Sequence, residues 1–450
     1  MINMQRELLE KQLREQKIEL VRAIYVGPDG ITRGKAFRPG ELDAILESGI
    51  GLTQAQMSVN VFDHLPPLSK YQPVGEVRIR PDVDTFQVLP YLPGHARMLA
   101  DVETLQGDPW ELCPRSLLKD FLSRLAARGL QIQAAFENEF TLSDQTETGW
   151  EPVDQLNCFS SAAMDLASPF ILPLIDALEQ QGIKVEKYYP EAGPGQQEIP
   201  IRHQAGLLAA DQQVVFKETV RGVALAHGYR VSFMPKISPA FAGNGCHIHF
   251  SLWDEGRNLF YDPAGEFNLS GTARHFMGGI LKHLPALMAL TAPTTNSYRR
   301  FVERCWSSSY TCWGPDNREA SVRAASGYQG QEAATVNLEY RPCDPTCNPY
   351  LALSGLICAG LDGIENELDP GDPVLTDPAL LSAEERRALN MNAYPTDLES
   401  ALSALEQNSV LLSGFGENRI TDYLTMKRAE ISMLDSLGDE GERQAYEFRF

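Results

Sequence analysis

Phe136-Glu137-Asn138-Glu139-Phe140 lies inside an apolar stretch, residues 132–142, that has the pattern of a β-strand. Side chains alternate between the two faces of a strand, so Glu137 and Glu139 are expected on the same face. Two like charges on one buried face oppose each other's ionisation, and a bound cation removes that cost. Mg²⁺ and Mn²⁺ prefer oxygen ligands, so the pair is a candidate metal site. The alternative is a half-exposed strand whose acidic face meets water.

A second strand, predicted over residues 246–252, repeats this spacing with histidines. His247 and His249 share one face, and imidazole is a common metal ligand. Gly243 and Gly245 precede them and allow a backbone to approach a ligand closely. An isolated pair of this kind is more often structural or exposed, and that interpretation stays open here.

Two further acidic motifs occur at residues 191–198 and 339–341. Glu191 and Glu198 lie on either side of a tight turn that contains Gly193-Pro194-Gly195, although a surface loop explains an isolated octapeptide better. Glu339 and Arg341 have the i, i+2 spacing with opposite charges, and the simpler interpretation there is a salt bridge between them.

Four arginines in low-charge segments are candidate anion ligands, because a guanidinium binds carboxylates and phosphates through two parallel hydrogen bonds. Most such arginines are surface groups. No Walker A loop is present, since Gly34-Lys35 lacks the preceding glycine and the following Ser or Thr. A nucleotide would therefore be held by carboxylate-bound metals and arginines. The four candidates are Arg300, Arg318, Arg323 and Arg341.

The order of predicted elements indicates an α+β chain of two domains. A small unit, residues 1–112, combines a helix over residues 5–17 with strands over residues 20–26 and 31–37 and a strand-rich region over residues 75–101. A larger unit, residues 113–450, mixes strands and helices and ends in a mainly helical region. Its predicted helices cover residues 116–128 and 205–226, a helix that starts near residue 349, and residues 383–435.

The bulk composition excludes several classes of function. The chain has 450 residues, is 43% hydrophobic and carries a formal net charge of −21, so it lacks the basic face of a nucleic-acid binder. The charged N-terminus is unlike a signal peptide, and no stretch is expected to reach the roughly 20 apolar residues that span a bilayer. Eight cysteines without a CxxC pair indicate reduced thiols. We therefore expect a cytoplasmic protein that binds neither nucleic acid nor membranes.

These motifs follow one another in an order and at a spacing that resemble the glutamine synthetase family. The resemblance covers nearly the whole chain: residues 33–35, 136–140, 191–198, 233–236, 243–252, 296–300, 317–318, 339–341, 348–350 and 359–364. It implies an N-terminal β-grasp-like domain followed by a catalytic domain with a curved antiparallel sheet and helices. It also implies a homo-oligomer of stacked rings, expected to be a dodecamer, with active sites between subunits.

The resemblance further implies an ATP-dependent ligase that acts on L-glutamate with two to three Mg²⁺ or Mn²⁺ ions in each site. Matching motif positions assigns one metal to Glu139, Glu191 and Glu198, and a second metal to Glu137, His247 and Glu339. Positions that contact the nucleotide are Glu186, His249, Ser251, Arg318 and Arg323. Positions that bind glutamate are Glu139, Gly243, Arg300 and Arg341. The two catalytic positions are Arg300 and Arg318, of which Arg318 matches the arginine that stabilises the transferring phosphoryl group.

Two positions depart from the family's ammonium site. The N-terminal segment that would carry an aspartate, residues 51–57, has no acidic residue, and Trp306 stands where a glutamate is expected. Ammonium needs an anionic cage and a base, whereas an indole offers an apolar or cation–π surface. The sequence therefore predicts the glutamate–amine ligase branch, which makes γ-glutamylamides from a small organic amine. Alkylamines, ethanolamine, polyamines and aromatic amines are candidates.

Three alternatives remain at this point. Trp306 could be a packed loop residue in a shifted alignment. The chain could be a true glutamine synthetase in which other groups replace the lost carboxylates. It could also be a non-catalytic structural or regulatory homologue, against which the presence of all six candidate metal ligands and Arg318 argues.

Overall fold

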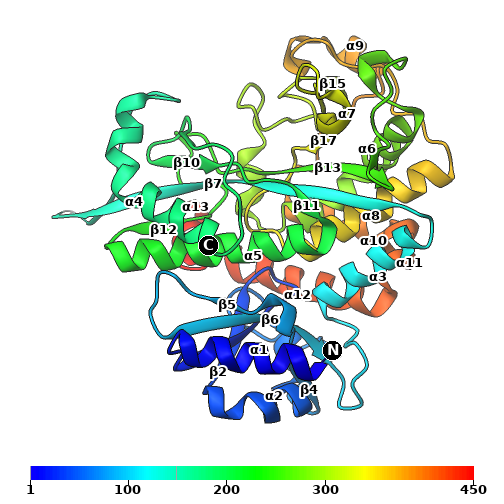
Figure 1. Cartoon of the computed structure of the whole chain (residues 1–450). Helices are drawn as coiled ribbons and strands as arrows, with labels where there is room; N and C mark the ends of the chain where they lie inside the picture. Colours follow the sequence, from blue (N-terminus) through cyan, green and yellow to red (C-terminus); the bar gives the residue numbers. More distant parts are fainter. Residues whose placement is uncertain (1, 148) are drawn as a thin grey trace.

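A computed structural model describes residues 2–147 and 149–450 and is built around two β-sheets (Figure 1). The N-terminal sheet has the strand order β2-β1-β6-β4-β3, with β5 paired to β6. β1 and β6 run parallel in its middle, and its other pairings are antiparallel. Its elements are α1 (Ile2–Glu15), β1 (Leu20–Val26), β2 (Thr32–Phe37), α2 (Leu42–Ser48), β3 (Ile50–Thr53), β4 (Glu76–Pro81), β5 (Gln87–Val88) and β6 (His95–Glu103).

The larger sheet has the order β15-β16-β17-β13-β7-β10-β9, and the short strands β8, β11 and β12 pair with β7 while β14 pairs with β13. Its described pairings are antiparallel except that of β15 with β16. The members are β7 (Gln131–Thr146), β8 (Gly149–Pro152), β9 (Tyr189–Pro190), β10 (Gln196–Ile199), β11 (Gln204–Ala205), β12 (Arg230–Ser232), β13 (Cys246–Asp254), β14 (Arg257–Asn258), β15 (Trp313–Pro315), β16 (Val322–Ala325) and β17 (Asn337–Tyr340). The α+β class, with a curved and mainly antiparallel sheet, is confirmed.

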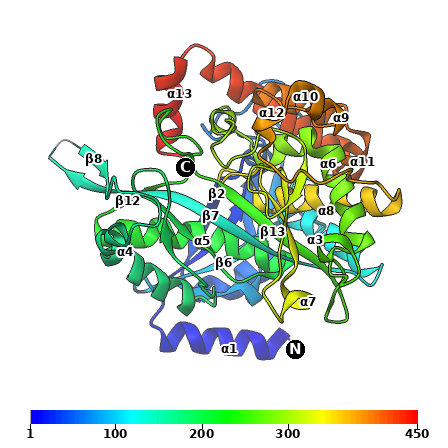
Figure 2. The ribbon, with the colours of Figure 1, turned by 90° about the horizontal axis from the view of Figure 1, so that it is seen from above.

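The helices of the C-terminal region gather along one side of the molecule (Figure 2). α5 runs beneath β7 and separates it from the N-terminal unit in Figure 1. The helices are α3 (Pro114–Ala126), α4 (Ser161–Gln180), α5 (Gly206–His227), α6 (Gly271–Thr291), α7 (Glu332–Thr335), α8 (Pro349–Glu365), α9 (Ala383–Ala388), α10 (Leu398–Glu406), α11 (Ser409–Phe415), α12 (Glu417–Leu434) and α13 (Gly438–Glu447). The described residues also form six short 3₁₀ turns: η1 (Pro39–Glu41), η2 (Gln54–Met57), η3 (Val83–Thr85), η4 (Glu266–Asn268), η5 (Asn296–Arg300) and η6 (Pro378–Leu380).

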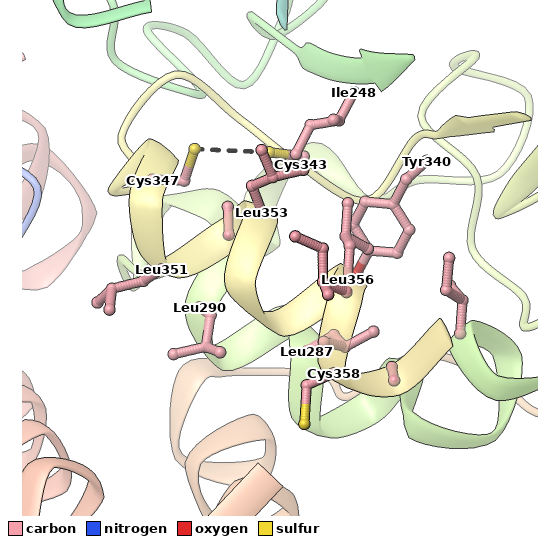
Figure 3. Packing of buried hydrophobic residues seen from close by; sticks show 14 of the residues in the cluster. Ile248, Leu287, Leu290, Tyr340, Cys343, Cys347, Leu351, Leu353, Leu356 and Cys358 are labelled. Carbon is pink, nitrogen blue, oxygen red and sulfur yellow. Dashed lines mark hydrogen bonds between the residues drawn. The ribbon is translucent and has the colours of Figure 1, made fainter. Parts of the chain in front are cut away.

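The apolar face of the larger sheet forms the main core. Ile248 of β13 and Tyr340 of β17 are fully buried and point towards leucines of α6 and α8 (Figure 3). The two helices approach closely because Gly279 faces the backbone of α8, where a Cβ would lie 2.0 Å from the carbonyl oxygen of Ala359. Strand alternation then directs the neighbours of Ile248 and Tyr340 to the opposite face of the sheet.

A buried arginine ties the N-terminal sheet to the larger unit. Arg115 lies in the first turn of α3 and bonds Asp211 of α5 at 2.9 Å. Its guanidinium also contacts Asp82 at 2.9 Å and Asp101 of β6 at 3.2 Å. Because removal of one partner from such a buried network leaves an uncompensated charge, the network fixes how the two units sit together.

Among the described residues, five helices were absent from the predicted elements: α2, α4, α6, α7 and α13. The expectation that no stretch could span a membrane by length and composition was wrong for α4, in which an 18-residue window has a mean hydropathy of 1.3. A packed core helix passes the same test, and Phe170, Ile171 and Leu174 of α4 are buried in a cluster shared with α5. All eight cysteines are free thiols.

Candidate active site

The pairing of five neighbouring strands brings the predicted acidic and histidine motifs and Arg323 onto one sheet face. Glu198 of β10 lies opposite Glu139 of β7, and Glu137 of β7 lies opposite His247 of β13. Further along, His249 of β13 lies opposite Glu339 of β17, and Glu339 lies opposite Arg323 of β16. The motifs that are distant in sequence thus form one continuous polar row on the face away from the core.

One end of this row holds three carboxylates that share a buried space. Glu139 Oε2 accepts hydrogen bonds from Gln196 Nε2 at 2.6 Å and from the Gly245 amide at 2.9 Å. Burial, followed by the charge of Glu191, raises the pKa of Glu139 to about 7. Burial and the charges of Glu137 and Glu139 raise the pKa of Glu198, and burial raises that of Glu191. These groups resist simultaneous ionisation, which a bound cation would permit.

The middle of the row holds two carboxylates between two imidazoles. His247 Nδ1 lies 3.3 Å from Glu339 Oε1 and 3.6 Å from Glu137 Oε2, and His249 Nε2 lies 3.4 Å from Glu137 Oε2. Burial and Arg341 lower the pKa of His247 to about 4. Burial lowers the pKa of His249 too, but Glu137 and Glu339 outweigh it and raise that pKa.

The donor set fits divalent cations. Ligand atoms of Glu137, His249 and Glu339 all lie within 4.8 Å of one another. His247 Nε2 is buried without a hydrogen-bond partner in the described part of the chain. Both observations suit a metal bound by carboxylate oxygens and imidazole nitrogen. The resemblance assigns the second metal to Glu137, His247 and Glu339. The geometry adds His249 as a further candidate ligand beside Glu137 and Glu339.

The four candidate arginines differ in their burial and in their partners. Arg300 and Arg341 are buried, whereas Arg323 is partly buried and its Nε lies 2.8 Å from Glu339 Oε2. Arg341 also pairs with Glu339, so the salt bridge between these two residues does form. The Arg300 guanidinium donates to the Cys343 carbonyl oxygen at 2.7 Å. Arg318 is exposed, and among the described residues no hydrogen bond or ion pair holds its guanidinium.

The remaining candidates lie at the edges of this face. Ser251 is buried on β13 in the same alternation as the two histidines, and it accepts a hydrogen bond from Trp253 Nε1 at 2.8 Å. Gly243 packs on Arg300, and a Cβ there would lie 2.3 Å from the Pro235 carbonyl oxygen. Glu186 is exposed and bonds Arg202 Nε at 3.0 Å, so it is not joined to the carboxylate row by a contact.

Trp306 lies on an irregular segment, residues 301–308, which we call the Trp306 loop. Its side chain is 58% exposed, so it is not the packed residue that the alternative interpretation required. The Trp306 carbonyl oxygen accepts a hydrogen bond from Arg341 Nη2 at 2.6 Å. The loop is therefore tied directly to the arginine that pairs with Glu339.

Several supporting residues escaped the sequence analysis. Gln196 holds Glu139, the Tyr189 hydroxyl donates to Glu198, and Asn337 Oδ1 lies 2.9 Å from His249 Nδ1. Gln196 and Asn337 each precede a candidate ligand by two residues on the same strand. The period-2 rule that paired Glu137 with Glu139 would have found them.

Comparison with known proteins shows the same relationship along the whole chain. The family description "Glutamine synthetase, catalytic domain" matches residues 111–446, and "Glutamine synthetase N-terminal domain" matches residues 5–110. A glutamine synthetase of Halobacterium salinarum is 37% identical over 384 residues, which are 84% of this chain and 84% of that protein. The γ-glutamylpolyamine synthetase GlnA3 of Streptomyces coelicolor is 31% identical over 446 residues, 98% of this chain and 96% of that protein.

Solved structures agree with these relatives. A structure described as a novel glutamine synthase homologue superposes with a TM-score of 0.86 at 33% identity and covers 96% of this chain and 99% of its own. A GmaS–ADP complex superposes with a TM-score of 0.84 at 30% identity, with 97% and 98% covered.

Proposed function

The chain belongs to the glutamine synthetase family of ATP-dependent C–N ligases, and from this premise we propose that it joins a small organic amine to the γ-carboxylate of L-glutamate. The products would be a γ-glutamylamide, ADP and phosphate. The observation that carries the choice of an organic amine is the exposed indole of Trp306. The backbone carbonyl oxygen of Trp306 accepts a hydrogen bond from Arg341.

The proposed chemistry has two steps. The γ-phosphoryl group of ATP passes to a γ-carboxylate oxygen of glutamate, which forms γ-glutamyl phosphate and releases ADP. The amine nitrogen then attacks the γ-carbonyl carbon and loses a proton, and phosphate departs. Activation is needed because the oxygen of a free carboxylate is a poor leaving group, whereas phosphate is a good one.

Each part of the polar row has a role in this proposal. Arg300 and Arg341, both buried, would bind the glutamate carboxylates, and exposed Arg318 would reach the transferring phosphoryl group. The carboxylates and imidazoles would hold two to three Mg²⁺ or Mn²⁺ ions, which would offset the negative charge of the phosphates. We also propose that the protein works in the cytoplasm as a ring-shaped homo-oligomer, expected to be a dodecamer.

The N-terminal segment independently supports an organic amine, rather than ammonia, as the substrate. Residues 51–57 contain no carboxylate, and the Lys35 ammonium group donates to the Gly51 carbonyl oxygen at 2.5 Å. Arg78 lies beside the same glycine and pairs at 3.1 Å with Glu76, a carboxylate that also lies beside Gly51. A carboxylate already paired with an arginine is less available to bind ammonium.

We expect an amine panel to identify an organic substrate. Phosphate release is measured with glutamate, ATP and Mg²⁺ or Mn²⁺, using ammonia, n-butylamine, ethanolamine, putrescine, spermidine and aniline, and the amide product is identified by mass spectrometry. At least one organic amine should exceed ammonia in kcat/KM by about tenfold, which corresponds to ~1.4 kcal/mol. A clear preference for ammonia over every organic amine would instead make the protein a glutamine synthetase, as several relatives are named.

The substitution Trp306→Glu should shift the preference towards ammonia. It replaces an apolar surface with a carboxylate that can bind ammonium, so the kcat/KM ratio of ammonia to the best organic amine should rise about tenfold. Trp150→Glu is the matched control, because Trp150 is also exposed but lies on the remote β8 hairpin. An unchanged ratio in Trp306→Glu would remove Trp306 from the amine pocket.

A further inference from the structure

The Trp306 loop has an unusual backbone. Three of its residues have φ values in the left-handed region: Arg304 at 59°, Trp306 at 56° and Ser308 at 62°. None of the three is glycine, so each conformation costs free energy and persists only where neighbouring groups hold it. The contacts of the loop therefore show which residues determine its shape.

Both polar atoms of the Trp306 backbone are bonded to side chains from outside the loop. The amide N–H donates to Glu319 Oε1 at 2.7 Å, and the carbonyl oxygen accepts from Arg341 Nη2 at 2.6 Å. Burial raises the pKa of Glu319, and the backbone amides of Trp306 and Ser308 oppose that rise. The Glu319 carboxylate therefore lies beside two of the three strained positions.

The base of the loop is held separately. Ser307 and Ser308 are buried, and the Tyr394 hydroxyl donates to Ser308 Oγ at 2.8 Å. Ser307 Oγ donates to the Val302 carbonyl oxygen at 3.3 Å. These contacts hold the two ends of the loop but do not involve the Trp306 backbone. Within the described ranges, the hydrogen bonds from that backbone to side chains are those with Glu319 and Arg341, and they determine where the indole lies.

We propose that Glu319 is a positioning residue for the amine pocket, which it shapes by holding the Trp306 backbone in its left-handed conformation. This inference rests on the proposed role of Trp306. Glu319 directly follows Arg318, the proposed phosphoryl-binding residue, and Arg341 pairs with Glu339, a proposed metal ligand. The two side chains that bind the Trp306 backbone are therefore each adjacent to another part of the proposed active site. The amine pocket is thereby built by the same segments that bind the other substrates.

The chemistry of the side chain explains why a carboxylate is suitable. Glutamate only accepts hydrogen bonds, so both of its oxygens are available to amide donors. A glutamine of the same length retains one acceptor oxygen and would preserve part of the contact, whereas an alanine removes it. Glu303 is a matched control, because it lies in the same loop but accepts its hydrogen bond from the Tyr310 hydroxyl.

The first test separates amine binding from the other substrates. KM values for n-butylamine, ethanolamine and putrescine, and for glutamate, are measured in Glu319→Ala, Glu319→Gln and Glu303→Ala. Glu319→Ala should raise the amine KM about tenfold more than the glutamate KM. Glu319→Gln should recover part of that loss, and Glu303→Ala should match the wild-type protein. Equal changes in amine and glutamate KM would overturn the proposal.

A second measurement does not depend on which amine is used. The protein is labelled with 5-fluorotryptophan, and the ¹⁹F resonance of Trp306 is assigned by its loss in Trp306→Phe. This resonance should move or broaden in Glu319→Ala and return towards the wild-type position in Glu319→Gln. An unmoved resonance overturns the role of Glu319. A preference for ammonia in the amine panel would overturn the proposed substrate class, and the ¹⁹F result would still report whether Glu319 positions Trp306.

Discussion

The substitution Arg318→Ala should reduce kcat for glutamate-dependent phosphate release by about 10³-fold or more, with little change in stability. An arginine that stabilises a transferring phosphoryl group contributes roughly 10³ to 10⁵ in kcat. The Arg318 side chain is exposed and makes no hydrogen bond or ion pair with the described residues, so its removal should change the free energy of unfolding by no more than about 0.5 kcal/mol.

Two further variants sharpen this experiment. Arg318→Lys keeps the charge but loses the planar fork, so its kcat should lie between those of the wild-type protein and Arg318→Ala. Arg257→Ala removes another exposed arginine, from β14, and should behave as the wild-type protein. A kcat for Arg318→Ala within tenfold of wild type, at saturating ATP and glutamate, would remove Arg318 from the phosphoryl-transfer step.

The substitution Glu198→Gln should separate metal binding from the stability of the metal-free protein. Glu198 is 4% exposed and shares its space with Glu137 and Glu139. Burial, followed by the charges of Glu137 and Glu139, raises the pKa of Glu198, so this carboxyl group costs the folded state stability at neutral pH. Glutamine removes that cost, so the metal-free variant should be more stable than the wild type by about 1 kcal/mol. The same change removes a proposed metal ligand, so kcat should fall by about 10²-fold or more.

Thermal unfolding with and without Mn²⁺ provides the measurement. Mn²⁺ should raise the Tm of the wild-type protein through binding to the native state, and this rise should be largely lost in Glu198→Gln. Glu179→Gln, an exposed change on α4, is the control and should retain the full metal-induced shift. The proposed ligand role fails if Mn²⁺ stabilises Glu198→Gln as much as the wild type.

Local patterns in the sequence predicted the central strands well. The predicted strand over residues 132–142 lies within β7, that over residues 20–26 coincides with β1, and that over residues 246–252 lies within β13. Alternation also placed Glu137 with Glu139 and His247 with His249 on one face. These predictions succeeded because the two-residue period of a strand is a local property of the backbone.

Helices inside the larger unit were harder to predict. α4 contains Pro169 and Pro173, and α6 contains Pro285, although proline usually marks the end of a helix. Both helices form because one face of each packs into a hydrophobic core. Tertiary packing outweighed the local signal in these segments.

The sequence by itself determined the family resemblance, the α+β class and the residues from which the site is built, because those depend on residue types and short spacings. Only the tertiary structure decided which of these residues lie next to each other in the folded protein. The strand register places Glu137 opposite His247 and His249 opposite Glu339, across separations of about a hundred residues. It also decided that Glu319 and Arg341 together bind the backbone of Trp306. Contacts of this kind depend on hydrogen bonding between distant segments, on which local periodicity carries no information.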